Sequence, residues 1–194
     1  MEVERKHKLP EGSFAAVRSR LEGLGFAPAG TKHQIDVYYL KSGQPDTDTH
    51  FMIGTESAYL RLRHNVETDA FSFDLKLVDE RAHSGIHGEY EVALKGAPSF
   101  ENCDAILKLL GFRRGCVVDK RRETFRKGEF EIALDAVEGL GEFIEIEIIA
   151  DESSASAALA RVDALASEFG LGGSTQMTTG YVDLWAWKKS GKPF

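Results

Sequence analysis

The sequence predicts an α+β fold, in which an antiparallel β-sheet curls into a closed tube and helices pack on its outside. Three observations favour this fold class. Alternating apolar and charged residues dominate the chain, a few segments show helical spacing instead, and different strands carry charges of opposite sign. No low-complexity linker interrupts the 194 residues, so we expect a single domain over residues 1–194.

The strands follow from the alternation. Successive side chains of a strand point to opposite faces, so residues two positions apart lie on the same face. Arg61 and Arg63, for example, share one face of their segment, while Leu60 and Leu62 share the other. The same pattern predicts eight strands, at residues 2–8, 33–40, 58–65, 70–78, 88–95, 115–126, 129–137 and 142–149.

Apolar residues at helical spacing predict three helices between these strands. The first carries Phe14, Val17 and Leu21 on one stripe. Serine is a common N-cap and glycine a common helix stop, which places the helices at residues 10–24, 99–111 and 153–170. We expect the C-terminal segment with Trp185 and Trp187 to be extended, so that the two rings share a face.

Charged residues recur as same-sign neighbours on one strand face. Like charges crowded on one face repel one another unless opposite charges lie among them. A closed tube would relieve this repulsion by bringing acidic strands opposite basic ones. The alternative is an open sheet with one solvated face, which is ordinary for any single strand. The residues concerned are Glu2, Glu4, Lys6, Arg61, Arg63, Asp74, Lys76, Glu89, Glu91, Lys120, Arg122, Asp135, Glu145 and Glu147.

A cavity lined by both signs of charge has a chemical logic. Carboxylate oxygens are the ligands that Mg²⁺ and Mn²⁺ prefer. Arginine forks and lysine point charges match phosphate oxygens. The pattern therefore predicts a site for a polyanion that is chelated to a divalent cation, such as a triphosphate.

Composition limits the other partners. Asp and Glu number 31 against 24 Lys and Arg, and the net charge of −7 argues against a general nucleic-acid binder. No stretch approaches the roughly 18 apolar residues that cross a bilayer, and no apolar signal region follows the first residues. We therefore expect a cytoplasmic protein without membrane contact. Trp185 and Trp187 are expected to pack internally or to anchor a homodimer contact.

An ordered set of motifs runs along nearly the whole chain. Glu2-x-Glu4-x-Lys6 is followed by Asp36-x-Tyr38-Tyr39, Arg61-x-Arg63, Lys76, Glu89-x-Glu91, Lys120-x-Arg122, Asp135 and Gly139-Leu140-Gly141-x-Phe143-x-Glu145-x-Glu147. This set resembles the CYTH superfamily, the triphosphate tunnel metalloenzymes. The superfamily groups class IV adenylyl cyclases with thiamine triphosphatases and inorganic tripolyphosphatases. Residues 118–147 look most like the cyclases.

The resemblance implies an eight-stranded antiparallel tunnel with helices outside and a requirement for Mg²⁺ or Mn²⁺. By this resemblance Glu2, Glu4, Asp135, Glu145 and Glu147 would hold the metal. Triphosphate would be bound by Lys6, Arg61, Arg63, Lys76, Lys120 and Arg122, with Lys6, Lys120 and Asp135 as catalytic residues. Glu89 and Glu91 would have a supporting role, such as orienting the basic side chains. We expect Arg61→Ala to lower turnover and to leave the fold intact, because it removes phosphate contacts and no core volume.

Two reactions fit the same bound triphosphate. A cyclase would convert ATP to cyclic AMP and pyrophosphate, and the similarity of the second half of the chain favours it. The alternative is hydrolysis of inorganic tripolyphosphate, thiamine triphosphate or a nucleoside triphosphate. A third hypothesis, a non-catalytic nucleotide- or polyphosphate-binding protein, is disfavoured because a pure anion binder gains little from four glutamates. We expect the contacts that choose the substrate at residues 41–57, 79–87 and the C-terminal segment.

Overall fold

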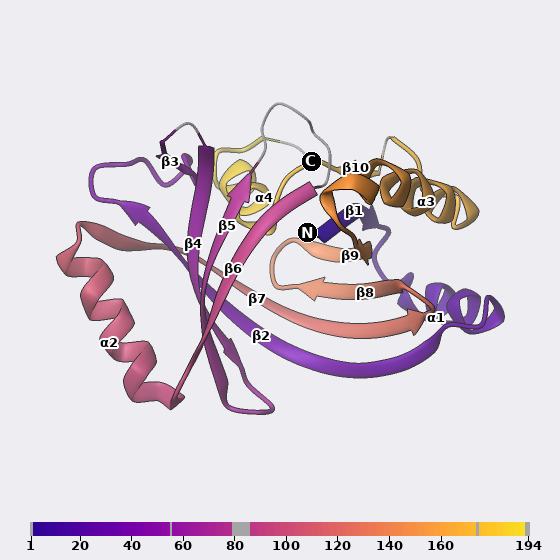
Figure 1. Ribbon diagram of the computed structural model, residues 1–194, viewed down its shortest axis with the longest axis horizontal. Helices are drawn as coiled ribbons and strands as arrows, with labels where there is room; N and C mark the ends of the chain where they lie inside the picture. The colour runs from indigo at the N-terminus through magenta and orange to yellow at the C-terminus, as the bar shows by residue number, and fades with distance from the viewer. Residues whose placement is uncertain (1, 55, 79–85, 174, 193–194) are drawn as a thin grey trace. The chain divides into compact units, whose positions relative to one another are not determined.

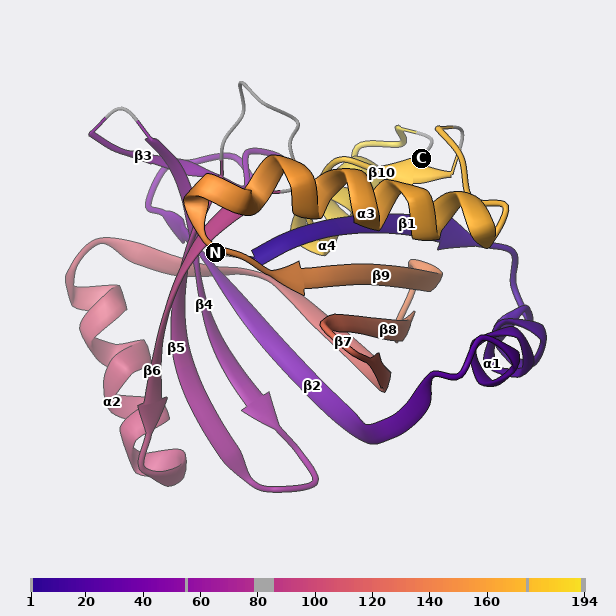
Figure 2. The same ribbon diagram turned by 45° about the vertical axis from the view of Figure 1, so that its right-hand side comes forward.

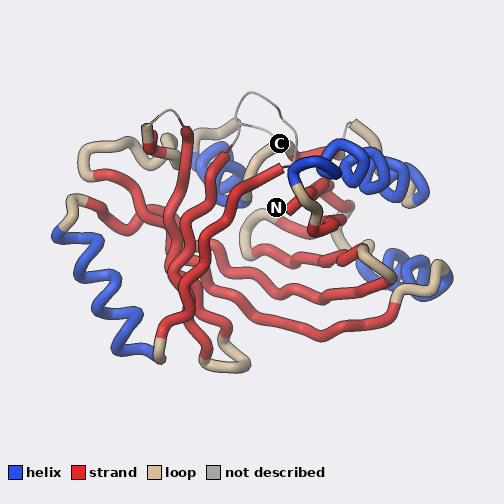
Figure 3. The backbone as a smooth tube through the Cα atoms, in the orientation of Figure 1, coloured by secondary structure: helices blue, strands red, loops and turns tan. Residues whose placement is uncertain are grey.

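The computed structural model describes residues 2–54, 56–78, 86–173 and 175–192. Within these residues the chain forms ten β-strands, four α-helices and one 3₁₀ turn (Figures 1 and 3). In chain order they are β1 (Glu2–Leu9), α1 (Phe14–Gly23), β2 (Ala27–Lys41), β3 (Phe51–Ile53), β4 (Glu56–Asn65), β5 (Ala70–Val78), β6 (Ile86–Leu94), α2 (Gly96–Leu109), β7 (Phe112–Lys127), β8 (Phe130–Val137), β9 (Gly141–Ile149), η1 (Glu152–Ser154), α3 (Ala155–Glu168), β10 (Gln176–Met177) and α4 (Tyr181–Lys189). None of the described helices has the length and apolar character needed to cross a membrane.

The α+β class and the antiparallel pairing are confirmed. The strands follow the hydrogen-bonded order β10–β1–β6–β5–β4–β2–β7–β8–β9, with β3 paired to β4 and β1 also paired to β9. The defined registers run antiparallel, as in the pairs of β4 with β5 and of β8 with β9.

The predicted eight-stranded closed tunnel needs correction. All eight predicted strands form, but the described residues contain two more, β3 and β10. With three and two residues, these strands are too short to show an alternation. β1 pairs with β9 along its whole length but with β6 only at Glu2 opposite His87 and Val3 opposite Ile86, so the described residues do not form the continuously hydrogen-bonded tunnel that was expected.

The chain divides into two compact units, each with its own apolar core. Unit 1 consists of Met1–Lys32, Arg81–His87 and Lys120–Thr178. In this unit α3 lies along β1 and β9 (Figure 2). The small side chains of α3 let the helix approach the apolar strand faces closely. The core of unit 1 includes Val3, Ile132, Leu134, Ile144, Ile146 and Ile148 from the strands and Ala155, Ala158, Val162 and Ala166 from the helix.

Unit 2 consists of His33–Glu80, Gly88–Asp119 and Thr179–Phe194. Here α2 lies against β5 (Figure 1), and Leu60 and Leu62 of β4 are buried with Leu107 of the helix. Asp104 joins α2 to β2 and β7, because its carboxylate accepts hydrogen bonds from the Tyr39 hydroxyl at 2.6 Å and from Arg114 Nε at 2.8 Å. The apolar faces of β4 and β5 therefore turn to the core, and their charged faces lie on the other side.

The C-terminal segment is helical rather than extended. α4 begins after Gly180, whose backbone N–H donates to the Asp183 carboxylate at 3.2 Å, and this cap favours a helix start. Residues two apart diverge by about 200° on a helix, so the half-buried Trp185 and Trp187 do not share a face. The extended conformation was expected because two tryptophans two residues apart are a pattern typical of a strand. The homodimer contact stays a prediction.

Two other helices begin at residues that differ from the expected ones. α1 starts at Phe14, because Gly12 has a positive φ of 78° and ends a turn before the helix. α2 starts at Gly96, three residues before the expected cap at Ser99.

Candidate functional site

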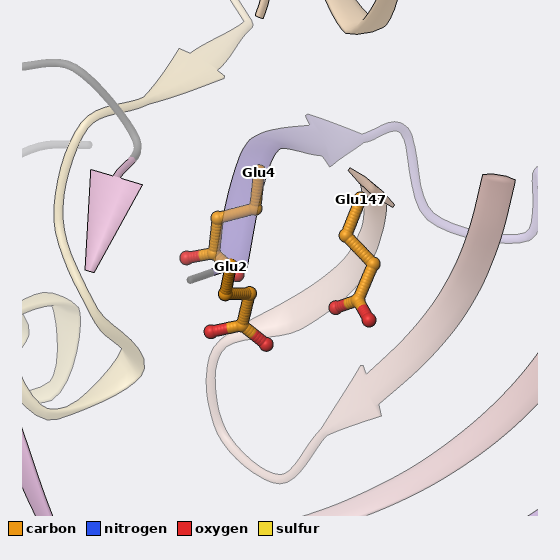
Figure 4. Close-up of side chains that lie close together, drawn as sticks. All are labelled: Glu2, Glu4 and Glu147. Carbon is orange, nitrogen blue, oxygen red and sulfur yellow. The ribbon is translucent and has the colours of Figure 1, made fainter. Parts of the chain in front are cut away.

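Three glutamate carboxylates of unit 1 lie close together. Glu2 and Glu4 share a face of β1, and Glu147 lies on β9, directly opposite Glu4 in the antiparallel register. One carboxylate oxygen from each residue lies within 4.8 Å of the other two (Figure 4). We call Glu2, Glu4 and Glu147 the glutamate triad.

The glutamate triad has the donor set that a hard divalent cation requires, since all its donor atoms are carboxylate oxygens. Burial, together with the negative charges of Glu2, Glu145 and Glu4, raises the pKa of Glu147 to about 8. A bound cation offsets the repulsion between neighbouring carboxylates and so favours the ionised form of such a carboxyl. These residues therefore fit Mg²⁺ or Mn²⁺.

The other two predicted metal ligands, Asp135 and Glu145, contact cationic side chains. Arg122 donates to the two oxygens of Asp135, from Nε at 2.7 Å and from Nη2 at 2.5 Å, and Nη2 also contacts Glu145. Lys6 Nζ lies 3.1 Å from Glu145 Oε1, and Lys120 Nζ lies 3.9 Å from Asp135 Oδ2. The registers explain these contacts, because Arg122 lies opposite Asp135 and Lys6 opposite Glu145.

This ion-pair network of unit 1 (Lys6, Lys120, Arg122, Asp135 and Glu145) sets the ionisation of Glu145. Burial on its own would raise the pKa of this carboxyl. The charges of Arg122, Lys6 and Lys120 outweigh burial and hold the pKa of Glu145 well below its usual range. The pKa values of these two glutamates of β9 are therefore shifted in opposite directions, downward for Glu145 and upward for Glu147.

Unit 2 contains a second charged group, on β4 and the strands around it. Arg61 donates from Nε to Asp74 at 2.7 Å and from Nη2 to Glu89 at 2.6 Å, and its Nη1 lies 3.7 Å from Asp36. Arg63 donates to both oxygens of Asp36, at 2.6 and 2.8 Å. We call Asp36, Arg61, Arg63, Asp74 and Glu89 the arginine cluster.

Asp36 and Asp74 were expected in the family motif and on a charged strand face, but not among the metal-binding, phosphate-binding or catalytic residues. Both are 1% exposed, and both hold guanidinium groups. Their place on the charged face could be found from the alternation, as Asp74 is two residues before Lys76. Their partners could not, because the register that sets Asp36 opposite Arg63 and Asp74 opposite Arg61 joins different strands.

Lys76 and Glu91 lie on the same face of unit 2 as the arginine cluster. The register places Lys76 opposite Glu89 and Asp74 opposite Glu91. The Lys76 side chain is half-buried, whereas Glu91 is exposed.

The segments expected to choose the substrate are described in part. Residues 55 and 79–85 lie outside the described residues. The 41–57 connection includes β3 and is attached to α4, because Thr49 donates to Asp183 and His50 Nε2 lies 3.3 Å from the same carboxylate. The His50 ring also stacks on Tyr59, with ring centroids 5.6 Å apart. The 41–57 connection and the C-terminal helix are thus joined within unit 2.

The family model of the CYTH domain matches residues 1–181, so this chain belongs to the CYTH family. The resemblance found in the sequence is confirmed.

Two relatives carry adenylate cyclase names. "Putative adenylate cyclase MJ0240" of Methanocaldococcus jannaschii is 30% identical over 147 residues, which cover 76% of this chain and 76% of that protein. "Adenylate cyclase CyaB" of Aeromonas hydrophila is 29% identical over 68 residues, which cover 29% of this chain and 36% of that protein.

Solved structures share the fold. PH1012 protein from Pyrococcus horikoshii superposes with a TM-score of 0.77 at 24% identity, over 95% of this chain and 99% of that one. HpAC1 from Hippeastrum, described as a "putative adenylyl cyclase" with a dominant triphosphatase activity, gives a TM-score of 0.65 at 19% identity, over 100% of this chain and 98% of that one. At these identities the likeness establishes the fold alone.

Proposed function

We propose that this chain is a divalent-metal-dependent enzyme that acts on a triphosphate, and that it converts ATP to cyclic AMP and pyrophosphate. One observation carries the proposal: three glutamates suited to a metal, on β1 and β9, lie in the same unit as a group of cations, Lys6 on β1 and Lys120 and Arg122 on β7. The cyclase names of the two relatives support the choice of reaction.

The glutamate triad would hold the Mg²⁺ or Mn²⁺ ion, with Asp135 and Glu145 as further proposed ligands. A bound ion of this kind offsets phosphate charge and lowers the pKa of a coordinated hydroxyl or water. In the structure Asp135 and Glu145 contact Arg122 and Lys6, so they also fix the positions of those cations.

The basic side chains would bind the phosphates. In unit 1 these are Lys6, Lys120 and Arg122, and in unit 2 they are Arg61, Arg63 and Lys76. Lys6 and Lys120 are 7% and 4% exposed, and buried ammonium groups stabilise charge on phosphoryl oxygens more strongly than solvated ones do. We therefore propose Lys6 and Lys120 as catalytic residues.

Asp135, which the resemblance implied as catalytic, acts in this proposal as a positioning residue. It is fully buried and holds the Arg122 guanidinium by two hydrogen bonds, so the arginine is oriented before a phosphate arrives. Glu89 and Glu91 would support the basic side chains of unit 2.

In the proposed reaction the ribose 3′-hydroxyl oxygen attacks the α-phosphorus. The bond from that phosphorus to the bridging oxygen of the β-phosphate breaks, the hydroxyl proton passes to solvent water, and pyrophosphate leaves. The chain's part is to align the triphosphate and to stabilise the charge on the departing pyrophosphate.

Triphosphate hydrolysis is the second candidate, favoured by the triphosphatase activity of the Hippeastrum protein. It starts from the same bound state, but water attacks the terminal phosphorus and orthophosphate is released. The substrate would be inorganic tripolyphosphate, thiamine triphosphate or a nucleoside triphosphate.

The test is turnover by the purified protein with Mg²⁺ or Mn²⁺ and, separately, ATP, thiamine triphosphate and tripolyphosphate. Cyclic AMP with pyrophosphate would support the cyclase, and orthophosphate the hydrolase. No product from any of them would contradict both. The double variant Glu2→Gln/Glu4→Gln should lose metal-dependent turnover, whereas a binding-only protein would hold its ligand unchanged.

A further inference from the structure

Arg61 is surrounded by three carboxylates that the fold holds with unequal firmness. Asp74 and Asp36 lie on the strands that flank β4, and both are 1% exposed. Glu89 lies one strand further away, on β6, and its side chain is 24% exposed. Among these three carboxylates, Glu89 is the one with room to move.

The register shows that Glu89 reaches Arg61 diagonally. The row of cross-strand neighbours that contains Arg61 continues through Asp74 to Glu91. Glu89 belongs to the next row, where it lies opposite Lys76, yet its carboxylate is 2.6 Å from Arg61 Nη2. The contact therefore requires the Glu89 side chain to lean across β5, towards a cation that is not its direct neighbour.

The charges of the arginine cluster oppose the binding of an anion. Two guanidinium groups are matched by three carboxylates, Asp36, Asp74 and Glu89. A phosphate oxygen at Arg61 would lie close to the Glu89 carboxylate already bound there, and two like charges at such a distance repel one another. Asp36 and Asp74 are fixed, so only the departure of Glu89 changes this balance.

We propose that Glu89 is an autoinhibitory residue, whose carboxylate occupies on Arg61 Nη2 the position that a substrate phosphate oxygen takes. The proposal rests on the proposed function, in that it treats Arg61 as a phosphate-binding residue. Triphosphate binding displaces Glu89, and Lys76 is the direct neighbour towards which Glu89 swings. The supporting role expected for Glu89 thus includes opposition to its own substrate.

This proposal predicts that removal of the Glu89 charge tightens the binding of tripolyphosphate, whereas loss of a supporting residue would weaken it. In Glu89→Gln the amide oxygen still accepts the hydrogen bond from Arg61, so the guanidinium stays in place while the negative charge is lost. Glu101→Gln is the matched control. It removes the same charge from an exposed position on α2 of unit 2, and Glu101 is not among the proposed binding residues.

The experiment is isothermal titration calorimetry with inorganic tripolyphosphate in EDTA, for the wild type and both variants, after thermal unfolding has shown that each is folded. We expect Kd to fall about tenfold in Glu89→Gln and to change less than about twofold in Glu101→Gln. An unchanged or weaker affinity in Glu89→Gln, or no binding at all, overturns the proposal. Equal tightening in both variants does so too, since it would reflect net charge alone.

Failure of the proposed function has a different signature. It would appear as absent metal-dependent turnover of any triphosphate by the wild type, a measurement that does not enter the comparison of dissociation constants.

Discussion

The glutamate triad of unit 1 and the arginine cluster of unit 2 arise from the same strand alternation, yet they differ in charge balance. In the triad the like charges of Glu2 and Glu4 act with burial to raise the pKa of Glu147 to about 8. In the arginine cluster each carboxylate lies within 4 Å of a guanidinium nitrogen.

The difference comes from the register between strands. β1 places Glu4 opposite Glu147 on β9, so acidic residues meet. β4 places Arg61 opposite Asp74 and Arg63 opposite Asp36, so opposite charges meet. A group of like charges attracts an ion from solution, whereas a group of opposite charges holds its own side chains in place. One kind of region is suited to a metal, and the other to rigid, oriented arginines.

The largest expected effect is on the glutamate triad. Glu147→Gln should lower metal-dependent turnover about a thousandfold, because it removes a ligand oxygen from the proposed metal site. Turnover is measured at saturating Mg²⁺, beside Glu129→Gln, which removes a carboxylate whose side chain is 44% exposed. Comparable rates in the two variants would contradict the assignment of the triad.

The next effect concerns the arginine cluster. Arg61→Ala should lower the free energy of unfolding by about 3 kcal/mol, because it leaves Asp74 buried without its cation. The side-chain contacts thus revise the expectation from the sequence that this change leaves the fold intact. Urea unfolding measures the loss, and Arg61→Lys, which keeps the charge, should lose less. Equal stability of Arg61→Ala and the wild type would mean that Asp74 does not depend on the charge of Arg61.

A third prediction uses pH to separate the two regions. With its pKa raised to about 8, Glu147 keeps its proton in the folded chain over a pH range in which the unfolded chain has lost it. The contribution of Glu147 to the free energy of unfolding is therefore highest below about pH 4.5 and is lost as the pH rises towards about 8. We expect the loss to be about 2 kcal/mol once solvent screening is allowed for.

Urea unfolding in EDTA at pH 5 and pH 8 measures this slope for the wild type and Glu147→Gln. The variant lacks the titrating carboxyl, so its stability should fall less over this range. Identical slopes would show that Glu147 titrates normally.

The smallest expected effect is on an exposed ion pair, whose contribution to stability is compared with that of the buried ion pairs. Arg126 contacts Glu131 in unit 1, but its side chain is 66% exposed. Arg126→Ala should change the free energy of unfolding by less than about 0.5 kcal/mol, since solvent already screens the pair. A loss as large as that of Arg61→Ala would remove the distinction between buried and surface pairs on which the comparison depends.

Much of the fold could be predicted from the sequence, because alternation is a local property. The faces of β4 are as expected, with Leu60 and Leu62 in the core of unit 2 and Arg61 on the other face. Two strands escaped notice because three or two residues show no period. The C-terminal helix was missed because the pattern at Trp185 and Trp187 resembles a strand, while the cap at Gly180 and Asp183 decides the conformation.

The sequence could predict which residues belong to the candidate site, but not which of them contact one another. The charged-face assignment included the glutamate triad, the ion-pair network and the arginines. It could not show that Glu145 contacts Lys6 and Arg122, or that Asp36 holds Arg63, because these contacts depend on register across strands. No property of a single strand contains that information.

The unlike faces of β4 also constrain how this chain tolerates changes in length. A single inserted residue within Glu56–Asn65 would exchange the two faces beyond the insertion, sending a guanidinium into hydrocarbon and a leucine into the ionic layer. Extra residues are better accommodated in the turn at residues 66–69, where no side-chain parity has to be kept. Insertions or labels should therefore be placed at that turn, where they leave the alternation of side chains along β4 unchanged.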